Sequence, residues 1–532
     1  MKKIIITLCL LLPLAVLAQD IQEINKLIQY RRYPSAEVKA KALVNADRSN
    51  GQNLFWLTQV YVAAKDSAAL LSLDIPTSED SWFRIATANK LLFKGDAVAA
   101  RSLFDAALGN SRKKDPALMA EIARSNIYNN NGDRQYAIDL LEQTIKKDKH
   151  NPELYTMMGD AWFRLRNGSE AFKAYQKALE INNAYAPASF QVGKIFATQD
   201  NREMFLKYYN DAVAADPAFA PAWYELSYQH WTKDRSKALE YYNKYLAVTD
   251  VNEQDEYQLA DLLYLNKRYD EALNKATVLL KKPGAQNRLN KLVAYIYKAK
   301  NDFDQSLNYM NVYLSNGADS NFIVEDYSFV ADIYEQKKEP AKAAEWYEKT
   351  IPMLKDSAEI YSYYKKLSDF YKEQKEYEQQ VPWVEKYYTQ SGKGTNVDLF
   401  NWGFALYMSK DYTKADSVFN VYSNKYPEDV YGPYWQARSM VAIDTAMAEG
   451  LAIPYYEKLI AVAGKDTSKA LNKKYLAEAY GYIAAYVANE KKDYDMAIDY
   501  FEKLLEVDPA NNEAKKYIEV LEKMNSRTSA AN

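Results

Sequence analysis

The chain repeats one short pattern along most of its length, and this periodicity constrains its fold more than any other feature. One slot of the pattern, usually filled by Ala, recurs every 33 to 37 residues, with a last spacing of 45. The slot is held by Ala100, Ala137, Ala171, Phe205, Ala238, Ala272, Ser306, Ala343, Gln380, Ala415, Ala452 and Ala497. We therefore expect an elongated array of similar units, in which each unit packs against its neighbours.

Each unit has the pattern of two amphipathic helices joined by a tight turn. In the clearest unit, Tyr155, Gly159 and Trp162 lie at helical spacing, an Asn-Gly pair then interrupts the pattern, and Ala171 and Tyr175 resume it. Because Gly159 and Ala171 are small, they allow the two helices of the pair to approach closely. One helix pair buries too little apolar surface alone, so stability must come from stacking neighbouring pairs.

This pattern resembles the tetratricopeptide repeat, a helix-turn-helix unit of 34 residues. In the unit that starts at Pro152, the slots of the family are held by Tyr155, Met158, Gly159, Trp162, Ala171, Tyr175 and Ala178. The last unit supplies Ala485, Ala488, Ala497, Phe501, Leu504 and Pro509. The resemblance spans roughly residues 80 to 520 and implies an all-α fold, a right-handed α-solenoid of about twelve units.

The two ends of the chain differ from the repeats. Residues 1–18 combine two early lysines, an apolar run and a small residue at Ala18, which is typical of a secretory signal peptide. The run is shorter than a membrane-spanning helix requires, and Cys9 inside it does not fit a lipid-acceptor site. Composition and spacing predict these segments: signal peptide 1–18, degenerate helical repeats 19–80, main array 81–390, hinge 391–395, C-terminal repeats 396–524 and disordered tail 525–532.

The resemblance also implies a binding surface, because the first helix of each pair lines a concave groove in this family. Its exposed slots fall on Thr156 and Asp160 and on an aromatic strip that turns basic at one end. The strip comprises Phe163, Phe190, Lys194, Tyr224, Tyr228, Trp231, Tyr257, Tyr264, Arg288, Lys291, Tyr295 and Lys298. Two interpretations stay open: most of the 47 tyrosines pack between helices with their hydroxyls in water, or this strip anchors a partner.

Composition speaks against several functional classes. The chain has only 2 His and 1 Cys, and it carries no HExxH, CxxC or glycine-rich phosphate loop, so we expect no metal, no cofactor and no enzymatic activity. The formal net charge is −3, and the basic clusters are short and isolated. We therefore expect no nucleic-acid partner.

These observations predict a non-catalytic scaffold that holds a protein or peptide in its groove. An aromatic groove can also stack on sugar rings, so a carbohydrate-binding protein is the alternative. The leader and the Lys-, Asn- and Tyr-rich composition resemble those of exported Bacteroidota repeat proteins. That resemblance implies a place in the periplasm or at the inner face of the outer membrane, within a secretion, motility or outer-membrane assembly.

Overall fold

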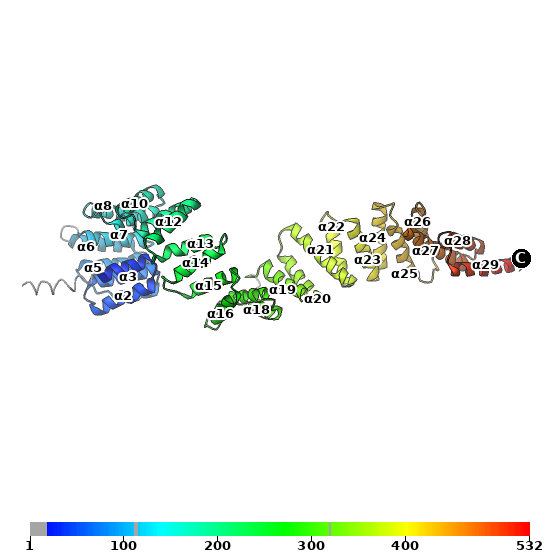
Figure 1. Cartoon of the computed structure of the whole chain (residues 1–532), viewed down its shortest axis with the longest axis horizontal. Helices are drawn as coiled ribbons and strands as arrows, with labels where there is room; N and C mark the ends of the chain where they lie inside the picture. The colour runs from blue at the N-terminus through cyan, green and yellow to red at the C-terminus, as the bar shows by residue number, and fades with distance from the viewer. Residues whose placement is uncertain (1–18, 111–114, 319–320, 532) are drawn as a thin grey trace, which may run out of the picture. The chain divides into compact units, whose positions relative to one another are not determined.

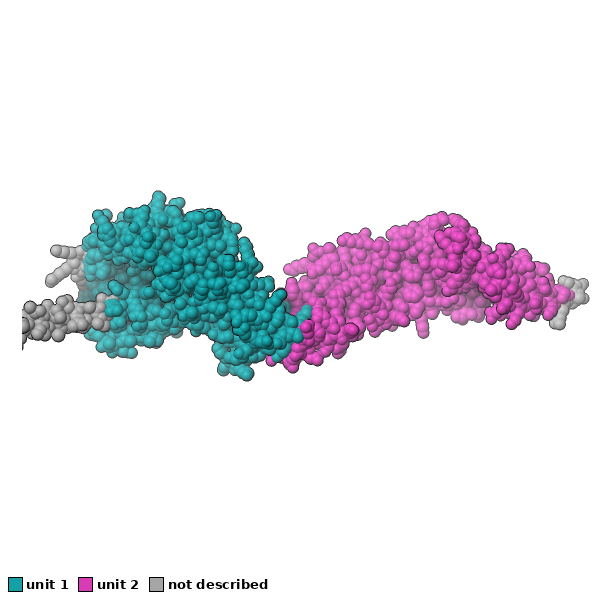
Figure 2. Space-filling view, in the orientation of Figure 1, with its two compact units in different colours: residues 1–300 teal, residues 301–532 magenta. Residues whose placement is uncertain are grey.

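The computed structural model describes residues 19–110, 115–318 and 321–531, and this part of the chain forms helices and turns with no strand. It divides into two compact units, residues 1–300 and 301–532 (Figure 2). The predicted all-α solenoid is confirmed within each unit, where helix pairs follow one another in chain order (Figure 1). The predicted signal segment, residues 1–18, lies outside the described residues.

The first unit starts with a helix over residues 19–29, followed by α2 (Tyr33–Ala46), α3 (Gly51–Ala64) and the short α4 (Ser67–Ser72). The first helices of its regular pairs are α5 (Ser81–Lys94), α7 (Pro116–Tyr128), α9 (Pro152–Arg164), α11 (Ala186–Thr198), α13 (Ala220–His230), α15 (Glu253–Leu265) and α17 (Arg288–Ala299). The second helices are α6 (Ala97–Asn110), α8 (Arg134–Ile145), α10 (Gly168–Ile181), α12 (Arg202–Ala215), α14 (Arg235–Leu246) and α16 (Tyr269–Leu280).

The second unit continues the alternation, because the unit boundary falls in the turn between α17 and α18. Its helices are α18 (Phe303–Ser315), α19 (Val324–Gln336), α20 (Pro340–Thr350), α21 (Ser357–Glu373), α22 (Tyr377–Gln390), α23 (Asn396–Met408), α24 (Tyr412–Lys425), α25 (Tyr431–Ile443), α26 (Ile453–Ala463), α27 (Ala470–Tyr486), α28 (Tyr494–Val507) and α29 (Asn512–Ala531).

The predicted hinge and the predicted tail can both be located relative to these helices. The proposed hinge, residues 391–395, connects α22 to α23 inside the second unit, and its flexibility stays a prediction. α29 continues to Ala531, since residues 525–531 contain neither Gly nor Pro to interrupt a helix, and the disorder of the tail 525–532 stays a prediction.

The repeated slot is the centre of each helix pair. All twelve slot residues are buried, including the atypical Phe205, Ser306 and Gln380. The residue four positions later is buried too, and in many pairs it is aromatic, as in Phe104, Tyr175, Tyr209, Tyr242, Tyr347, Phe419, Tyr456 and Phe501. The second helix thus packs the slot residue and the residue four positions later into the interior of each pair.

Candidate functional site

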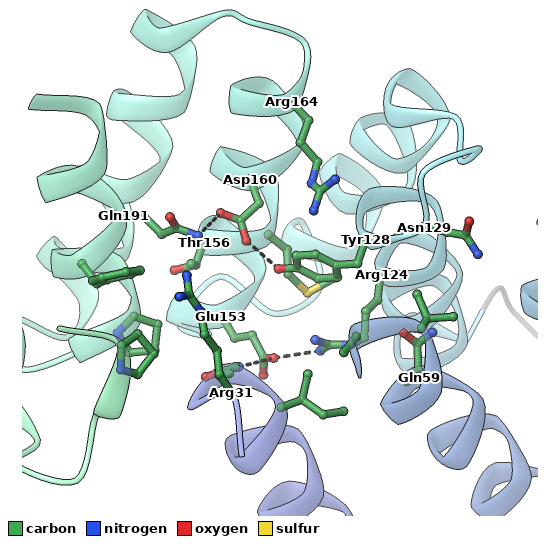
Figure 3. A pocket seen from close by; sticks show the side chains of 18 of the residues that line it. Arg31, Gln59, Arg124, Tyr128, Asn129, Glu153, Thr156, Asp160, Arg164 and Gln191 are labelled. Atoms are coloured by element: carbon green, nitrogen blue, oxygen red, sulfur yellow. Dashed lines mark hydrogen bonds and ion pairs between the residues drawn. The ribbon is translucent and has the colours of Figure 1, made fainter. Parts of the chain in front are cut away.

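A pocket of about 530 Å³ opens in the first unit, on the side lined by the first helices of successive pairs (Figure 3). Its walls come from α3, α7, α9, α11 and the start of α13, together with residues 28–33. Thr156 and Asp160 line this pocket, but they were predicted as exposed slots and are only 6% and 7% exposed, because the pocket side of α9 packs against neighbouring helices.

The N-terminal segment, residues 25–35, closes one side of this pocket. Asn25 and Gln29 donate hydrogen bonds of 2.7 and 2.9 Å to Oε1 of Glu153, at the start of α9. Tyr30 donates to Asp216, just before α13, and packs edge-on against Phe219 at 5.0 Å between ring centroids. Residues 25–30 thus contact the beginnings of helices that follow them by more than a hundred residues.

The same segment is anchored once more before α15. Asp250 accepts a hydrogen bond of 2.7 Å from the backbone N–H of Ser35 and forms an ion pair of 3.0 Å with Arg32. In Figure 1 the blue N-terminal helices accordingly lie beside green helices of the same unit. Burial alone would raise the pKa of Asp250, but the bonds from Ser35 and Arg32 outweigh burial and hold it below its usual range.

A buried ion-pair network forms the wall of the pocket on α7 and α9. Arg124 is 6% exposed and reaches Glu121 and Glu153, each at 2.8 Å. Burial alone would lower the pKa of Arg124, but the two adjacent carboxylates outweigh burial and raise it. For Glu153, burial raises the pKa, and Arg124, Asn25 and Gln29 together bring it below the ordinary value. The positive charge of Arg124 is therefore already balanced by Glu121 and Glu153.

Asp160 is the second buried acid of the pocket, and three neutral donors hold it. Its Oδ1 accepts hydrogen bonds from the Tyr175 hydroxyl at 2.6 Å and from Nε2 of Gln191 at 2.7 Å, and its Oδ2 accepts one from the Tyr128 hydroxyl at 2.6 Å. Burial raises the pKa of Asp160 above its usual range despite these bonds. The aspartate links α7, α9, α10 and α11 and fixes the geometry of the pocket.

The structure brings two residues of the predicted strip to the pocket, and a third, Phe163, lies next to one of them. Phe190 and Lys194, both on α11, line it, and the Lys194 ammonium lies 5.5 Å from the ring centroid of Phe163. The partner-binding role of these residues stays a prediction.

The other strip residues lie on or next to α13, α15 and α17, outside this pocket. Tyr228 is the most open of them, with 63% of its surface exposed. Tyr257 was expected to offer an exposed ring, but it is 1% exposed and lies beneath the guanidinium of Arg288, 5.2 Å from the ring centroid. Arg288 also forms an ion pair of 2.9 Å with Asp261.

The remaining aromatic and basic residues of the strip are half-buried. Tyr224 packs against Tyr245 at 5.3 Å, and Tyr264 lies 6.4 Å from Tyr295. Lys291 lies over the Tyr295 ring, whereas Trp231 directly follows α13 and Lys298 lies in the last turn of α17. For most of these rings, contacts with neighbouring rings support packing as one of their roles.

Arg124 and Arg31 were not predicted as pocket residues, although the repeat pattern could have identified Arg124. The predicted groove residues begin in the unit that starts at Pro152. Applying them to the unit at Pro116 places Arg124 in the slot of Asp160. Arg31 carried no such signal, because it lies before the regular repeats and reaches the pocket only through the docking of residues 25–35.

The stacked helix pairs give the chain the architecture of an α-solenoid repeat protein, with a pocket on the side of the first helices. Family models described as tetratricopeptide repeat match residues 122–187, 399–429 and 477–511. The chain therefore contains tetratricopeptide repeats, which are protein-interaction scaffolds, and the first matched segment includes the pocket walls on α7 and α9.

Solved structures give partial likenesses. The C-terminal part of a TPR repeat-containing protein from Cytophaga hutchinsonii is 25% identical, covers 49% of this chain and 99% of its own, and has a TM-score of 0.31. A tetratricopeptide repeat protein from Parabacteroides merdae is 17% identical, covers 47% of this chain and 96% of its own, and has a TM-score of 0.29. YrrB, described as a TPR protein with an unusual peptide-binding site, is 19% identical, covers 35% of this chain and 95% of its own, and has a TM-score of 0.30. No curated protein matches the chain.

Two further properties hold for the described residues. Among them, no cluster of three or more His, Cys, Asp or Glu side chains is arranged to hold a metal ion. None of the helices in that part of the chain combines the length and the apolar character needed to cross a membrane.

Proposed function

We propose that this protein is a non-catalytic scaffold of the cell envelope that holds a protein or peptide partner in the pocket of its first unit. The observation that carries the proposal is the pocket itself, a cavity of about 530 Å³ on the side of the solenoid lined by the first helices. Its walls are held by buried hydrogen bonds and ion pairs, so little conformational freedom is lost when a ligand enters.

The envelope location is part of this proposal and rests on the pattern of residues 1–18, which is typical of a secretory leader. Secretion, motility and outer-membrane assemblies are settings in which such a scaffold would act. Fractionation of cells that produce the chain tests the location, and recovery of uncleaved protein in the cytosol would contradict it.

The binding role is tested by capture of partners from envelope extract with three forms of the protein. Gln191→Trp fills the pocket from α11, whereas Gln135→Trp adds the same side chain on the exposed face of α8 as a matched control. Circular dichroism must show equal helicity in all forms. We expect a partner that the wild type and the Gln135 variant retain and the Gln191 variant loses.

A second variant separates the pocket from the rest of the predicted strip. Tyr224→Ala, Tyr228→Ala and Trp231→Ala together remove the rings on and next to α13, outside the pocket. A partner lost only in this triple variant would move the binding site to the strip. Retention of every partner by both variants would rule out the groove, and glycan binding that depends on the three rings would favour the carbohydrate alternative.

A further inference from the structure

Among the described residues, three of the cations that line the pocket form no ion pair of 4.0 Å or less. Arg31 comes from the N-terminal segment, Arg164 from the end of α9 and Lys194 from α11. Figure 3 shows Arg31 and Arg164 directed into the pocket from opposite sides. Within the part of the chain that the structure describes, no ion pair of 4.0 Å or less and no side-chain hydrogen bond joins these three groups to a carboxylate.

The nearby acids do not neutralise this cluster by direct contact. Both oxygens of Asp160 are occupied by tyrosine hydroxyls and an amide, and Glu153 is paired with Arg124. Glu225 on α13 interacts with Arg31 and Lys194 only at longer range, and burial raises its pKa. Like charges therefore converge on one cavity, an arrangement that costs free energy unless an anion occupies it.

The position of Arg31 is fixed from both sides. Its backbone adopts a left-handed conformation with φ of 60°, and its chain neighbours are both anchored, Tyr30 to Asp216 and Arg32 to Asp250. The guanidinium lies over the Phe190 ring, 5.7 Å from its centroid. These contacts hold the backbone at Arg31, while its exposed side chain stays able to contact an anion in the pocket.

Lys194 shows the electrostatic effect of the cluster. Burial lowers its pKa, Asp160 opposes that shift, and the positive charges of Arg31 and Arg164 lower it further. Its ammonium lies between the rings of Phe163 and Phe190, at 5.5 and 6.0 Å from their centroids. An incoming oxyanion would offset this repulsion, and the amide of Gln191 and the rings would contact the rest of the ligand.

We infer that the pocket recognises a carboxylate or phosphate group, held jointly by Arg31, Arg164 and Lys194. This inference rests on the proposed function, because it names the chemistry by which the pocket of the first unit selects its ligand. The site is complete only when the N-terminal segment is docked, since that segment supplies Arg31.

Isothermal titration calorimetry on the purified protein tests the inference, with inorganic phosphate and citrate as separate probes. We expect binding of at least one probe, weakened by added NaCl and roughly tenfold or more by each of Arg31→Gln, Arg164→Gln and Lys194→Gln. Lys237→Gln removes an exposed cation of α14 outside the pocket and should bind as the wild type does. Phosphate binding alone indicates a phosphorylated ligand, and citrate binding alone indicates a carboxylate ligand.

Absence of binding for both probes would overturn the inference, and so would equal binding by the wild type and the three pocket variants. The two proposals fail separately. A partner lost in Gln191→Trp but retained by the three cation variants overturns the oxyanion site and leaves the scaffold role standing. Cation-dependent anion binding without any captured partner supports the site and speaks against the scaffold role.

Discussion

In most helix pairs the turn places a residue in the left-handed region five positions before the repeated slot. In many pairs this residue is lysine, for example Lys267, Lys338 and Lys410, with φ of 60°, 59° and 69°. Left-handed backbone costs a residue with a Cβ atom about 1–2 kcal/mol, and Gly avoids this cost. The repeats thus retain a small local strain in an exposed turn.

Replacing one of these lysines with glycine is expected to stabilise the second unit. Lys410 is exposed, and Lys410→Gly relieves the strain while making the unfolded chain more flexible, so we expect a net gain of about 0.5–1 kcal/mol. Differential scanning calorimetry should show a higher unfolding midpoint. Lys410→Ala keeps the Cβ atom and serves as the control, and a lower midpoint for the glycine variant would refute the argument.

At the scale of the helix pair, one contact fixes how closely α9 and α10 approach. A Cβ atom on Gly159 would lie 2.4 Å from Cε1 of Tyr175, whose hydroxyl donates to Asp160. The same relation holds between Gly193 and Tyr209 and between Gly403 and Phe419. Each of these glycines leaves room for an aromatic ring of its own pair.

Gly159→Ala should therefore destabilise the first unit by about 1–3 kcal/mol, because the added methyl group displaces the Tyr175 ring. Thermal unfolding followed by circular dichroism measures the loss. Gly168→Ala, in the same pair, adds its methyl group to open space and should have little effect. Adding Tyr175→Leu to the Gly159 variant should recover part of the loss, and no recovery would place the cause elsewhere.

The sequence predicted the helix pairs well, because their spacing depends on local residues. Ala171 and Tyr175 mark the packed face of α10, and both are buried. The turn was predicted from the Asn-Gly pair at 167–168, but the left-handed residue is Arg166, which has no intrinsic preference for that conformation. Turn geometry here follows from the packing of both helices, which the sequence pattern does not encode.

At the scale of the first unit, the docked N-terminal segment could not be predicted from the repeats. Its bonds to Glu153 and Asp250 join residues separated by 128 and 218 positions, and such contacts leave no periodic trace in a sequence. The slot pattern pointed to Asp160 and Lys194, whereas Arg31 reaches the pocket only through this long-range docking. The candidate site was therefore only partly predictable.

The three anchors of this segment predict a dependence on pH. The pKa values of Glu153, Asp216 and Asp250 are all below their ordinary range in the folded chain: burial raises each of them, and bonds from the N-terminal segment and Arg124 outweigh it. A carboxyl with a depressed folded pKa stabilises the fold above its unfolded pKa of about 4, and this contribution is lost as the pH falls through the folded value.

We therefore expect the N-terminal segment to detach below about pH 4. Hydrogen exchange of residues 19–46, normalised to the intrinsic rate at each pH, should rise there before exchange in α9 and α11 does. Asp250→Asn should raise exchange in this segment already at pH 7, and Asp211→Asn, which breaks an exposed ion pair on α12, should not. Unchanged exchange between pH 7 and pH 3 would contradict the prediction.

The docking of residues 25–35 also affects the order in which the first unit folds. An open array can begin folding at any repeat, because every contact is local. Here residues 25–35 cannot complete their contacts locally, because the last anchor, Asp250, lies 215 residues after Ser35 in the chain. The helices from α5 to α14 can pack through local contacts alone, whereas residues 25–35 reach their native contacts only after Asp216 and Asp250 are in place.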